Sequence, residues 1–194
     1  MAIAIPPHKI RVLVFDLDGT LVDSKLDLAT SVNAARQHLG LAPLPHPQIF
    51  GYIGHGTPTL IRRSLGPDAG ESEIEAALEF FLDHYRAHLL DNTVAYPGVP
   101  EALERMQDRV LAVLTNKPVL FSRMILVGLG LAGMFRWVYG GESFERKKPD
   151  PMGVRAILEQ AGAQAREALV VGDSEIDVAT GCKAGTWTDR KSVV

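Results

Sequence analysis

The sequence has little cysteine and no long apolar run. Cys182 is the only cysteine among 194 residues, so no disulfide can form within the chain. We expect a reducing, cytoplasmic location, with Cys182 as a small buried residue of a helix. No apolar segment approaches the ~20 residues of a membrane span, and Met1–Pro7 lacks the charged and apolar regions of a signal peptide. These absences predict a cytoplasmic protein without a membrane partner.

The sequence also has no excess of basic residues. Lys and Arg total 20 against 23 Asp and Glu, which gives a formal net charge of −3. Proteins that bind nucleic acid or an anionic membrane present a basic patch, so neither partner is expected. The length allows one core domain plus a small insertion, and the protein is expected to be a monomer or a homodimer.

The pattern of apolar residues predicts an α/β fold interrupted by a helical insertion. Residues 10–15 predict a buried strand, and helical patterns occupy residues 22–92. Strands then alternate with helices, and we expect them at 110–114, 137–139 and 168–171. Such alternation is typical of parallel βα units with right-handed crossovers. The predicted fold is a doubly wound parallel sheet built from residues 1–21 and 93–194, with residues 22–92 as an inserted all-helical domain.

Local signals predict three helices in the insertion. Ser24 can cap a first helix that Gly40 ends, and Thr57 followed by Pro58 is a cap-then-proline pattern that opens a short second helix. Residues Ser72–Glu75 form a capping-box pattern at the start of a third. The proline-rich stretch Leu41–Pro47 predicts a connection between helices.

Polar residues gather where the predicted strands end, or in the loops that follow them. They are Asp16 and Asp18, Thr115 and Asn116, Lys147 and Lys148, and Gly172, Asp173, Ser174 and Asp177. The carboxyl ends of parallel strands meet at one edge of a sheet, where open α/β sheets bind ligands. We therefore expect one site at this edge.

The residue types at this edge suit phosphoryl transfer. Several carboxylates without a histidine or cysteine cluster favour Mg²⁺ over Zn²⁺. A lysine, a threonine hydroxyl and backbone N–H groups suit a phosphate. A carboxylate can attack phosphorus, although each pair of like unit charges costs about 4 kcal/mol at ~4 Å and an effective dielectric constant of ~20. A divalent cation and a lysine offset that repulsion, so the set indicates an aspartyl-phosphate mechanism.

Each element alone has a simpler interpretation. Asp-x-Asp-Gly also occurs in calcium loops, although the rest of that pattern is absent here. Thr115-Asn116 is typical of a helix cap, and Lys147 and Lys148 of a solvated surface. Gly172-Asp173 is typical of a strand-to-helix turn. The ordered combination favours a functional site.

At these residues the sequence resembles the haloacid dehalogenase superfamily of phosphohydrolases. Four stretches carry the resemblance, in the superfamily's order and spacing: Asp16–Ser24, Leu114–Lys117, Lys148-Pro149 and Val171–Asp177. Within the superfamily the chain looks like the phosphoglycolate phosphatase group. Three further stretches, together with the position of the insertion, are similar to that group: Tyr52–Gly56, Tyr96–Val99 and Gly140–Ser143.

The resemblance implies roles for the site residues. Asp16 would be the nucleophile and a Mg²⁺ ligand. Asp18 would protonate the leaving oxygen and then activate the hydrolytic water, and its backbone carbonyl would also bind the metal. Asp173 would bind Mg²⁺ directly or through water. Lys148 would neutralise Asp16 and the phosphoryl group.

Other residues would hold the phosphate or support the site. Thr115 and the backbone N–H of Asn116 would hold the phosphate together with the lysine. Asp177 would orient that lysine or the water shell of the metal. Gly172 would allow a close approach of the backbone, and Ser174 is expected beside it in the same supporting set.

The insertion would be a cap that closes over the site and excludes water. Gly54, His55 and Gly56 form a candidate hinge or substrate loop, or a plain turn. Arg62, with Arg63, could meet a substrate carboxylate, or lie on the surface as an ordinary helix charge.

The tail of the chain departs from the family pattern. Thr188–Val194 lacks a convincing strand and helix, so the sequence predicts a truncated or altered C-terminus that exposes a sheet edge. The predicted function is a Mg²⁺-dependent phosphomonoester hydrolase whose substrate is 2-phosphoglycolate. The alternatives are a sugar-phosphate phosphatase or phosphomutase on the same scaffold, and a non-catalytic remnant that binds a phosphorylated ligand.

Overall fold

A computed structural model describes residues 9–190, and the chain divides into two compact units. The first, here called the core unit, contains the chain up to Val22 and from Ala95 onward. The second, here called the inserted unit, is Asp23–Val94. Met1–Pro7, where the absence of a signal peptide was predicted, lies outside the described residues.

The core unit is built on a parallel sheet. Its five strands are β1 (Val12–Phe15), β4 (Val110–Leu114), β5 (Trp137–Tyr139), β6 (Ala168–Gly172) and β7 (Trp187–Arg190). They lie side by side in the order β5-β4-β1-β6-β7, so β1 is central and its four apolar residues are buried. A parallel strand covered on both faces needs such a continuous apolar run.

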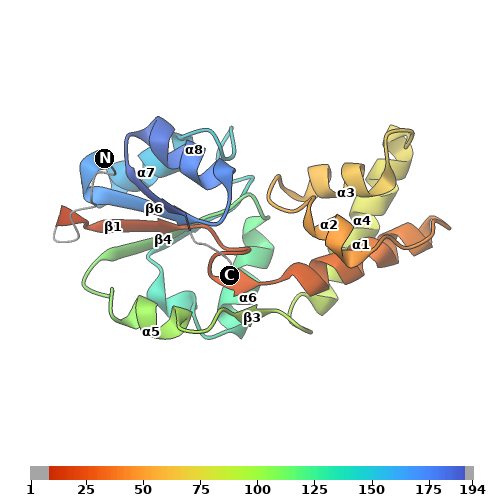
Figure 1. Ribbon diagram of the computed structural model, residues 1–194, viewed down its shortest axis with the longest axis horizontal. Coiled ribbons are helices and arrows are strands. Elements are labelled where there is room, and N and C mark those ends of the chain that lie inside the picture. Colours follow the sequence, from red (N-terminus) through yellow and green to blue (C-terminus); the bar gives the residue numbers. More distant parts are fainter. Residues whose placement is uncertain (1–8, 191–194) are drawn as a thin grey trace. The chain divides into compact units, whose positions relative to one another are not determined.

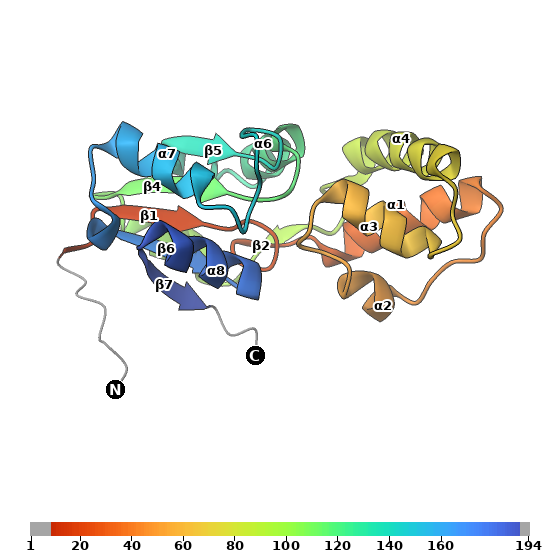
Figure 2. The ribbon, with the colours of Figure 1, turned by 90° about the horizontal axis from the view of Figure 1, so that it is seen from above.

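Helices cover both faces of this sheet, as Figure 1 shows. The core unit contains α5 (Val99–Glu104), α6 (Val119–Gly128), α7 (Met152–Ala161) and α8 (Glu175–Ala184), with the short 3₁₀ helices η2 (Ala132–Met134) and η3 (Ala165–Glu167). Helices α7 and α8 lie on one face, and α5 and α6 on the other. Figure 2 views the face that carries α7 and α8. The predicted doubly wound α/β fold is confirmed.

One face of the sheet packs against α7. Val12 and Val14 of β1 pair in register with residues of β4 and β6 on either side. Because alternate residues of a strand share a face, these side chains form one apolar layer with Ile157 of α7. Ile157 is fully buried in that layer.

Strand β7 corrects the prediction for the tail. The expectation that no strand follows Trp187 is wrong, because residues Trp187–Arg190 pair in parallel with β6. Trp187 Nε1 donates a hydrogen bond to the carbonyl oxygen of Arg166 at 3.0 Å. The strand was not recognised in the sequence because most of its residues are polar. An edge strand pairs with one neighbour only and therefore tolerates charged residues. Residues 191–194, the rest of that tail, lie outside the described residues.

The inserted unit is a group of four helices in the part of the chain that the structure describes. They are α1 (Lys25–His38), α2 (His46–Phe50), α3 (Thr57–Leu65) and α4 (Glu71–His88). Helix α1 packs on α4, and each helix has buried apolar side chains, among them Leu28 and Val32 of α1 and Phe81 and Tyr85 of α4. Where the chain enters and leaves this unit, β2 (Val22–Asp23) and β3 (Val94–Ala95) form a two-stranded sheet.

Three local predictions in this unit need correction. Helix α4 begins at Glu71, and its Glu73 carboxylate accepts the N–H of Gly70 at 2.9 Å, so the predicted capping box at Ser72–Glu75 is wrong. Helix α3 starts at Thr57 itself, with Gly56 as its cap. Helix α2 occupies part of the proline-rich stretch, because a proline is tolerated in the first turn of a helix.

A buried carboxylate closes the inserted unit. Asp27 of α1 is 2% exposed. It accepts the backbone N–H of Asn92 at 3.0 Å and that of Thr93 at 2.8 Å. The Thr93 hydroxyl also donates to it at 2.7 Å. Asp27 therefore links the start of α1 to the segment that follows α4.

The exposure of Cys182 differs from the prediction. Cys182 lies in α8 but is exposed, so the prediction of a buried residue is wrong. Within residues 9–190, none of the helices is both long and apolar enough to cross a membrane.

Candidate active site

The candidate site lies where three neighbouring strands of the core unit end. Asp16 follows β1, Thr115 follows β4, and Asp173 follows β6. The Asp16 N–H donates to the carbonyl oxygen of Val171 at 2.9 Å, which continues the ladder beyond the last residue of β1. The sheet therefore fixes the backbone from which the Asp16 side chain projects.

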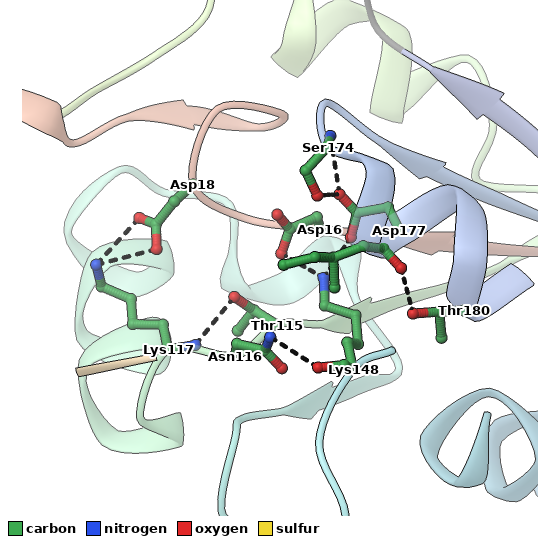
Figure 3. Close-up of polar contacts among 10 residues, drawn as sticks. Asp16, Asp18, Thr115, Asn116, Lys117, Lys148, Ser174, Asp177 and Thr180 are labelled. Carbon is green, nitrogen blue, oxygen red and sulfur yellow. Dashed lines mark hydrogen bonds and ion pairs between the residues drawn. The ribbon is translucent and has the colours of Figure 1, made fainter. Parts of the chain in front are cut away.

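Lys148 joins two of the predicted acids, as Figure 3 shows. Its Nζ lies 2.8 Å from Asp16 Oδ1 and 2.6 Å from Asp177 Oδ1. The side chains of Lys148, Asp16 and Asp177 are 4%, 12% and 2% exposed. A lysine at this depth requires a partner of opposite charge, and here it has two. Lys148 is thus buried, whereas the neighbouring Lys147 is exposed.

Burial and charge shift two pKa values in this cluster. Burial raises the pKa of Asp16 to about 6, against the opposing effect of the Lys148 ammonium and with a further rise from the Asp177 charge. Burial alone would lower the pKa of Lys148, but Asp16 and Asp177 together raise it above its ordinary value. Lys148 therefore stays charged, and Asp16 becomes a stronger base than an exposed aspartate.

Asp177 is held at both carboxylate oxygens. Its Oδ2 accepts the Ser174 N–H at 3.1 Å and the Ser174 hydroxyl at 2.5 Å, while Oδ1 accepts from Lys148. The carboxylate fits because residue 172 is glycine: a Cβ there would lie 2.2 Å from Asp177 Cγ. Asp177 is therefore arranged to orient Lys148, and Gly172 and Ser174 to orient Asp177.

Three carboxylates are close enough to hold a metal ion. Asp16, Asp173 and Asp177 each offer an oxygen, and these oxygens lie within 4.8 Å of one another. An all-oxygen donor set suits a hard cation such as Mg²⁺. The backbone of Gly19 passes close to this cluster with φ at +84°, and a Cβ at that residue would lie 2.2 Å from Asp173 Oδ2. Only glycine fits there without displacing Asp173.

Thr115 and Asn116 lie beside the lysine, at the end of β4. Both side chains are buried. Asn116 Nδ2 donates to the carbonyl oxygen of Lys148 at 3.1 Å, and Thr115 Oγ1 accepts the N–H of Lys117 at 3.2 Å. The peptide bond between Lys148 and Pro149 is cis. The loop that carries Lys148 is thus joined directly to the turn after β4.

One charged contact of the site was not predicted from the sequence. Lys117 Nζ lies 3.0 Å from Asp18 Oδ1 and 3.2 Å from Asp18 Oδ2. The two side chains are 4% and 13% exposed. The sequence shows this lysine directly after Thr115-Asn116, and that proximity was the available signal.

The predicted substrate residues of the insertion all belong to the inserted unit. Gly54, His55 and Gly56 lie between α2 and α3. Arg62 of α3 donates to both carboxylate oxygens of Glu71, at 2.8 and 2.9 Å. A part for these residues in substrate binding stays a prediction.

Comparison with known proteins identifies the family. The family described as haloacid dehalogenase-like hydrolase matches residues 13–188, which include all the site residues of the core unit. The chain belongs to the haloacid dehalogenase-like hydrolase family. The resemblance proposed from the four sequence stretches is confirmed.

Relatives in this family carry the name phosphoglycolate phosphatase. The protein of that name from Pseudomonas syringae pv. syringae (strain B728a) is 38% identical over 182 residues, which are 90% of the chain and 66% of that protein. The one from Chromobacterium violaceum is 38% identical over 183 residues, which are 91% of the chain and 82% of that protein. The chain thus spans slightly less than two thirds of the Pseudomonas relative.

A solved structure has the same fold. A protein from Haemophilus somnus 129pt, described as a predicted phosphoglycolate phosphatase, superposes with a TM-score of 0.88. The two are 31% identical in sequence, and the match covers 93% of this chain and 84% of that one.

Proposed function

We propose that this member of the haloacid dehalogenase-like hydrolase family is a Mg²⁺-dependent phosphomonoester hydrolase with 2-phosphoglycolate as its substrate. The observation that carries the proposal is the buried Lys148 between Asp16 and Asp177, beside Asp173. A protein that only bound phosphate would not need this many buried acids, because each repels a phosphate. The name shared by the relatives supports the substrate.

Asp16 is proposed to attack phosphorus. A carboxylate oxygen forms the O–P bond while the bond from phosphorus to the substrate oxygen breaks. Asp18 gives its proton to that departing oxygen, which leaves as the alcohol glycolate. Lys148 offsets the repulsion between Asp16 and the phosphoryl group, and Thr115 and Asn116 hold the phosphoryl oxygens.

Water then releases the phosphoryl group. Asp18, now ionised, takes a proton from a water molecule, whose oxygen attacks phosphorus. The O–P bond to Asp16 breaks, which restores the Asp16 carboxylate and releases inorganic phosphate. The net reaction consumes one water and yields glycolate and phosphate, and the protein ends as it began.

The acidic cluster fits Mg²⁺ as the cofactor. Asp16 and Asp173 supply carboxylate oxygens, and the backbone carbonyl of Asp18 is the further proposed ligand. Asp177 is within reach, but both of its oxygens already accept hydrogen bonds, so it is assigned to Lys148. When bound, the metal would offset the negative charge of the phosphoryl group.

The inserted unit is proposed to serve as a cap that selects the substrate. The proposed division is residues 22–92 for this cap and residues 1–21 and 93–194 for the catalytic part. Gly54, His55, Gly56 and Arg62 remain its candidate substrate residues.

The test of the proposal is phosphate release from a panel of small phosphorylated acids and sugars. We expect Mg²⁺-dependent release with 2-phosphoglycolate as the preferred substrate, and loss of turnover in EDTA. Asp16→Asn is expected to lower kcat by at least about 10³-fold. The matched control is Asp108→Asn at an exposed aspartate of the core unit.

Two other outcomes of the substrate panel would change the proposed function. Preference for a hexose phosphate, or isomerisation of one, would replace phosphoglycolate with the sugar-phosphate alternatives. A folded protein that releases phosphate from no phosphomonoester would overturn the enzymatic proposal and favour a binding remnant.

A further inference from the structure

Lys117 forms a second lysine–carboxylate pair beside the pair of Lys148 and Asp16. Its ammonium donates to both oxygens of Asp18, and both side chains are largely buried. In Figure 3 the Asp18 carboxylate faces Lys117, and a separate set of contacts surrounds Lys148. Each of the two acids that act on the phosphoryl group therefore has its own lysine.

The backbone that carries Lys117 is held by the loop after β5. The Gly141 N–H donates to the carbonyl oxygen of Lys117 at 3.0 Å. The Glu142 carboxylate accepts the N–H of Val119 at 2.8 Å. These contacts fix the turn between β4 and α6 at Lys117 itself and at Val119, two residues further on.

Glycine is required where this loop meets the turn. A Cβ at residue 140 would lie 2.7 Å from the carbonyl oxygen of Lys117, and a Cβ at residue 141 would lie 2.6 Å from that of Asn116. The Gly140–Ser143 stretch thus has a structural reason: it lets two backbone segments touch. The same turn donates the Lys117 N–H to Thr115 Oγ1, so Lys117 is fixed relative to the proposed phosphate ligand.

We propose that Lys117 is a positioning residue that acts through Asp18. Two hydrogen bonds from one ammonium define the orientation of the carboxylate, and a fixed backbone defines the position of the ammonium. The two bonds hold the ionised Asp18, the form that takes a proton from water. When Asp18 is protonated, Lys117 keeps its bond to one oxygen while the other gives its proton to the departing oxygen. This inference rests on the proposed function, and it adds a residue to which the family resemblance assigned no role.

The inference predicts that the effect of removing Lys117 depends on the leaving group. An alkyl phosphate such as 2-phosphoglycolate needs a proton at its departing oxygen. An aryl phosphate such as p-nitrophenyl phosphate releases a stable anion and needs little help in that step. Water attack needs Asp18 with either substrate.

The experiment is pre-steady-state kinetics of Lys117→Met with both substrates and saturating Mg²⁺. We expect kcat for 2-phosphoglycolate to fall roughly 10- to 100-fold. With p-nitrophenyl phosphate we expect a burst of p-nitrophenol approaching one equivalent, followed by slow turnover, because the aryl group leaves before water attack. Adding Lys117→Met to Asp18→Asn should cause little further loss, since both changes disable the same group.

Controls separate positioning from general damage. Lys183→Met, at an exposed lysine of α8, should match wild type. Lys117→Arg keeps the positive charge but moves the N–H donors, so kcat should show the same dependence on the leaving group with a smaller fall. This variant replaces Lys117→Met in the experiment if Lys117→Met does not fold. Circular dichroism and thermal melting check folding in each case.

Failure of this inference differs from failure of the proposed function. Wild-type protein that hydrolyses no phosphomonoester would remove the proposed function. Active wild type with an unchanged Lys117→Met variant would remove only the role of Lys117. An equal fall for both substrates without a burst, additive with Asp18→Asn, would also overturn it.

Discussion

At the scale of single residues, the candidate site is a set of buried charges that compensate one another. Asp16 and Asp177 share Lys148, and Asp18 faces Lys117. Removing one partner from such a pair leaves an uncompensated buried charge, which is costly. The lysines therefore matter to folding as well as to the proposed reaction, so experiments on the site must separate stability from activity.

The raised pKa of Asp16 predicts a pH-dependent stability of the metal-free protein. Its pKa is about 6 in the folded protein, against 3.8 for an ordinary aspartate. The folded protein therefore binds this proton more tightly than the unfolded chain, and its stability falls as the pH rises from about 4 to about 6. Asp16→Asn resembles the protonated form at every pH, so its free energy of unfolding relative to wild type should rise between about pH 4 and about pH 6.

Urea unfolding in EDTA across that pH range measures this difference. Asp108→Asn is the control, because that aspartate is exposed and should show no such dependence. A difference between Asp16→Asn and wild type that is the same at every pH would contradict the account.

Gly19→Ala is expected to weaken the binding of Mg²⁺ at the site. The new Cβ would collide with Asp173 Oδ2, so the carboxylate must move. We expect the Mg²⁺ concentration for half-maximal activity to rise roughly tenfold or more.

Gly40→Ala is the matched control: its φ of +73° imposes a similar backbone strain, but nothing lies within 4 Å of its Cβ. It should lower stability by about 1 kcal/mol and leave the Mg²⁺ requirement unchanged. The same Mg²⁺ shift in both variants would show that strain alone is responsible.

At the scale of helices and strands, the sequence was most informative where apolar runs are continuous. The strands at 110–114 and 137–139 have the predicted bounds. Their side chains are apolar or aromatic, and turn residues mark their ends. Strand β7 was missed because Thr188, Asp189 and Arg190 are polar, and only pairing with β6 makes them a strand.

Capping was harder to predict than the helices themselves. Helix α4 forms where its apolar stripe predicts it, but the capping contact joins Glu73 to Gly70, not Glu75 to Ser72 as predicted. Two overlapping capping patterns a residue or two apart differ little in free energy, so packing selects between them. The contact of Lys117 with Asp18 spans 99 residues of sequence, and no local pattern encodes its distance.

The tie between α1 and the end of the inserted unit gives a prediction at this scale. Asp27→Ala removes the acceptor of the Asn92 and Thr93 N–H groups, and the donor of Thr93 is then left without it in a buried position. We expect a loss of stability on the order of 3 kcal/mol and faster hydrogen exchange at both amides. Asp83→Ala, at an exposed residue of α4, should change stability by less than about 0.5 kcal/mol. Unchanged hydrogen exchange at Asn92 and Thr93 in Asp27→Ala would show that the hydrogen bonds to Asp27 are not needed to protect these amides.

At the scale of the whole molecule, the chain combines a doubly wound core unit with an inserted helical unit, in the haloacid dehalogenase-like hydrolase family. The parallel sheet explains why residues from three of the four distant stretches meet: the ends of β1, β4 and β6 are adjacent whatever lies between them in sequence. The fourth stretch, with Lys148, is joined to them through Asn116 and Asp16. The position of the site could therefore be predicted from the order of strands and polar residues. The substrate could not, because the residues proposed to select it lie in the insertion, where no local pattern specifies what they bind.

The central claim is that Asp16 carries the phosphoryl group during turnover. The measurement that tests it most directly is acid quenching of the protein during hydrolysis of 2-phosphoglycolate, followed by peptide mass spectrometry. The account predicts one phosphoryl group, located on Asp16, and none in Asp16→Asn. Turnover with no phosphorylated peptide, or with the phosphoryl group on another residue, would contradict it.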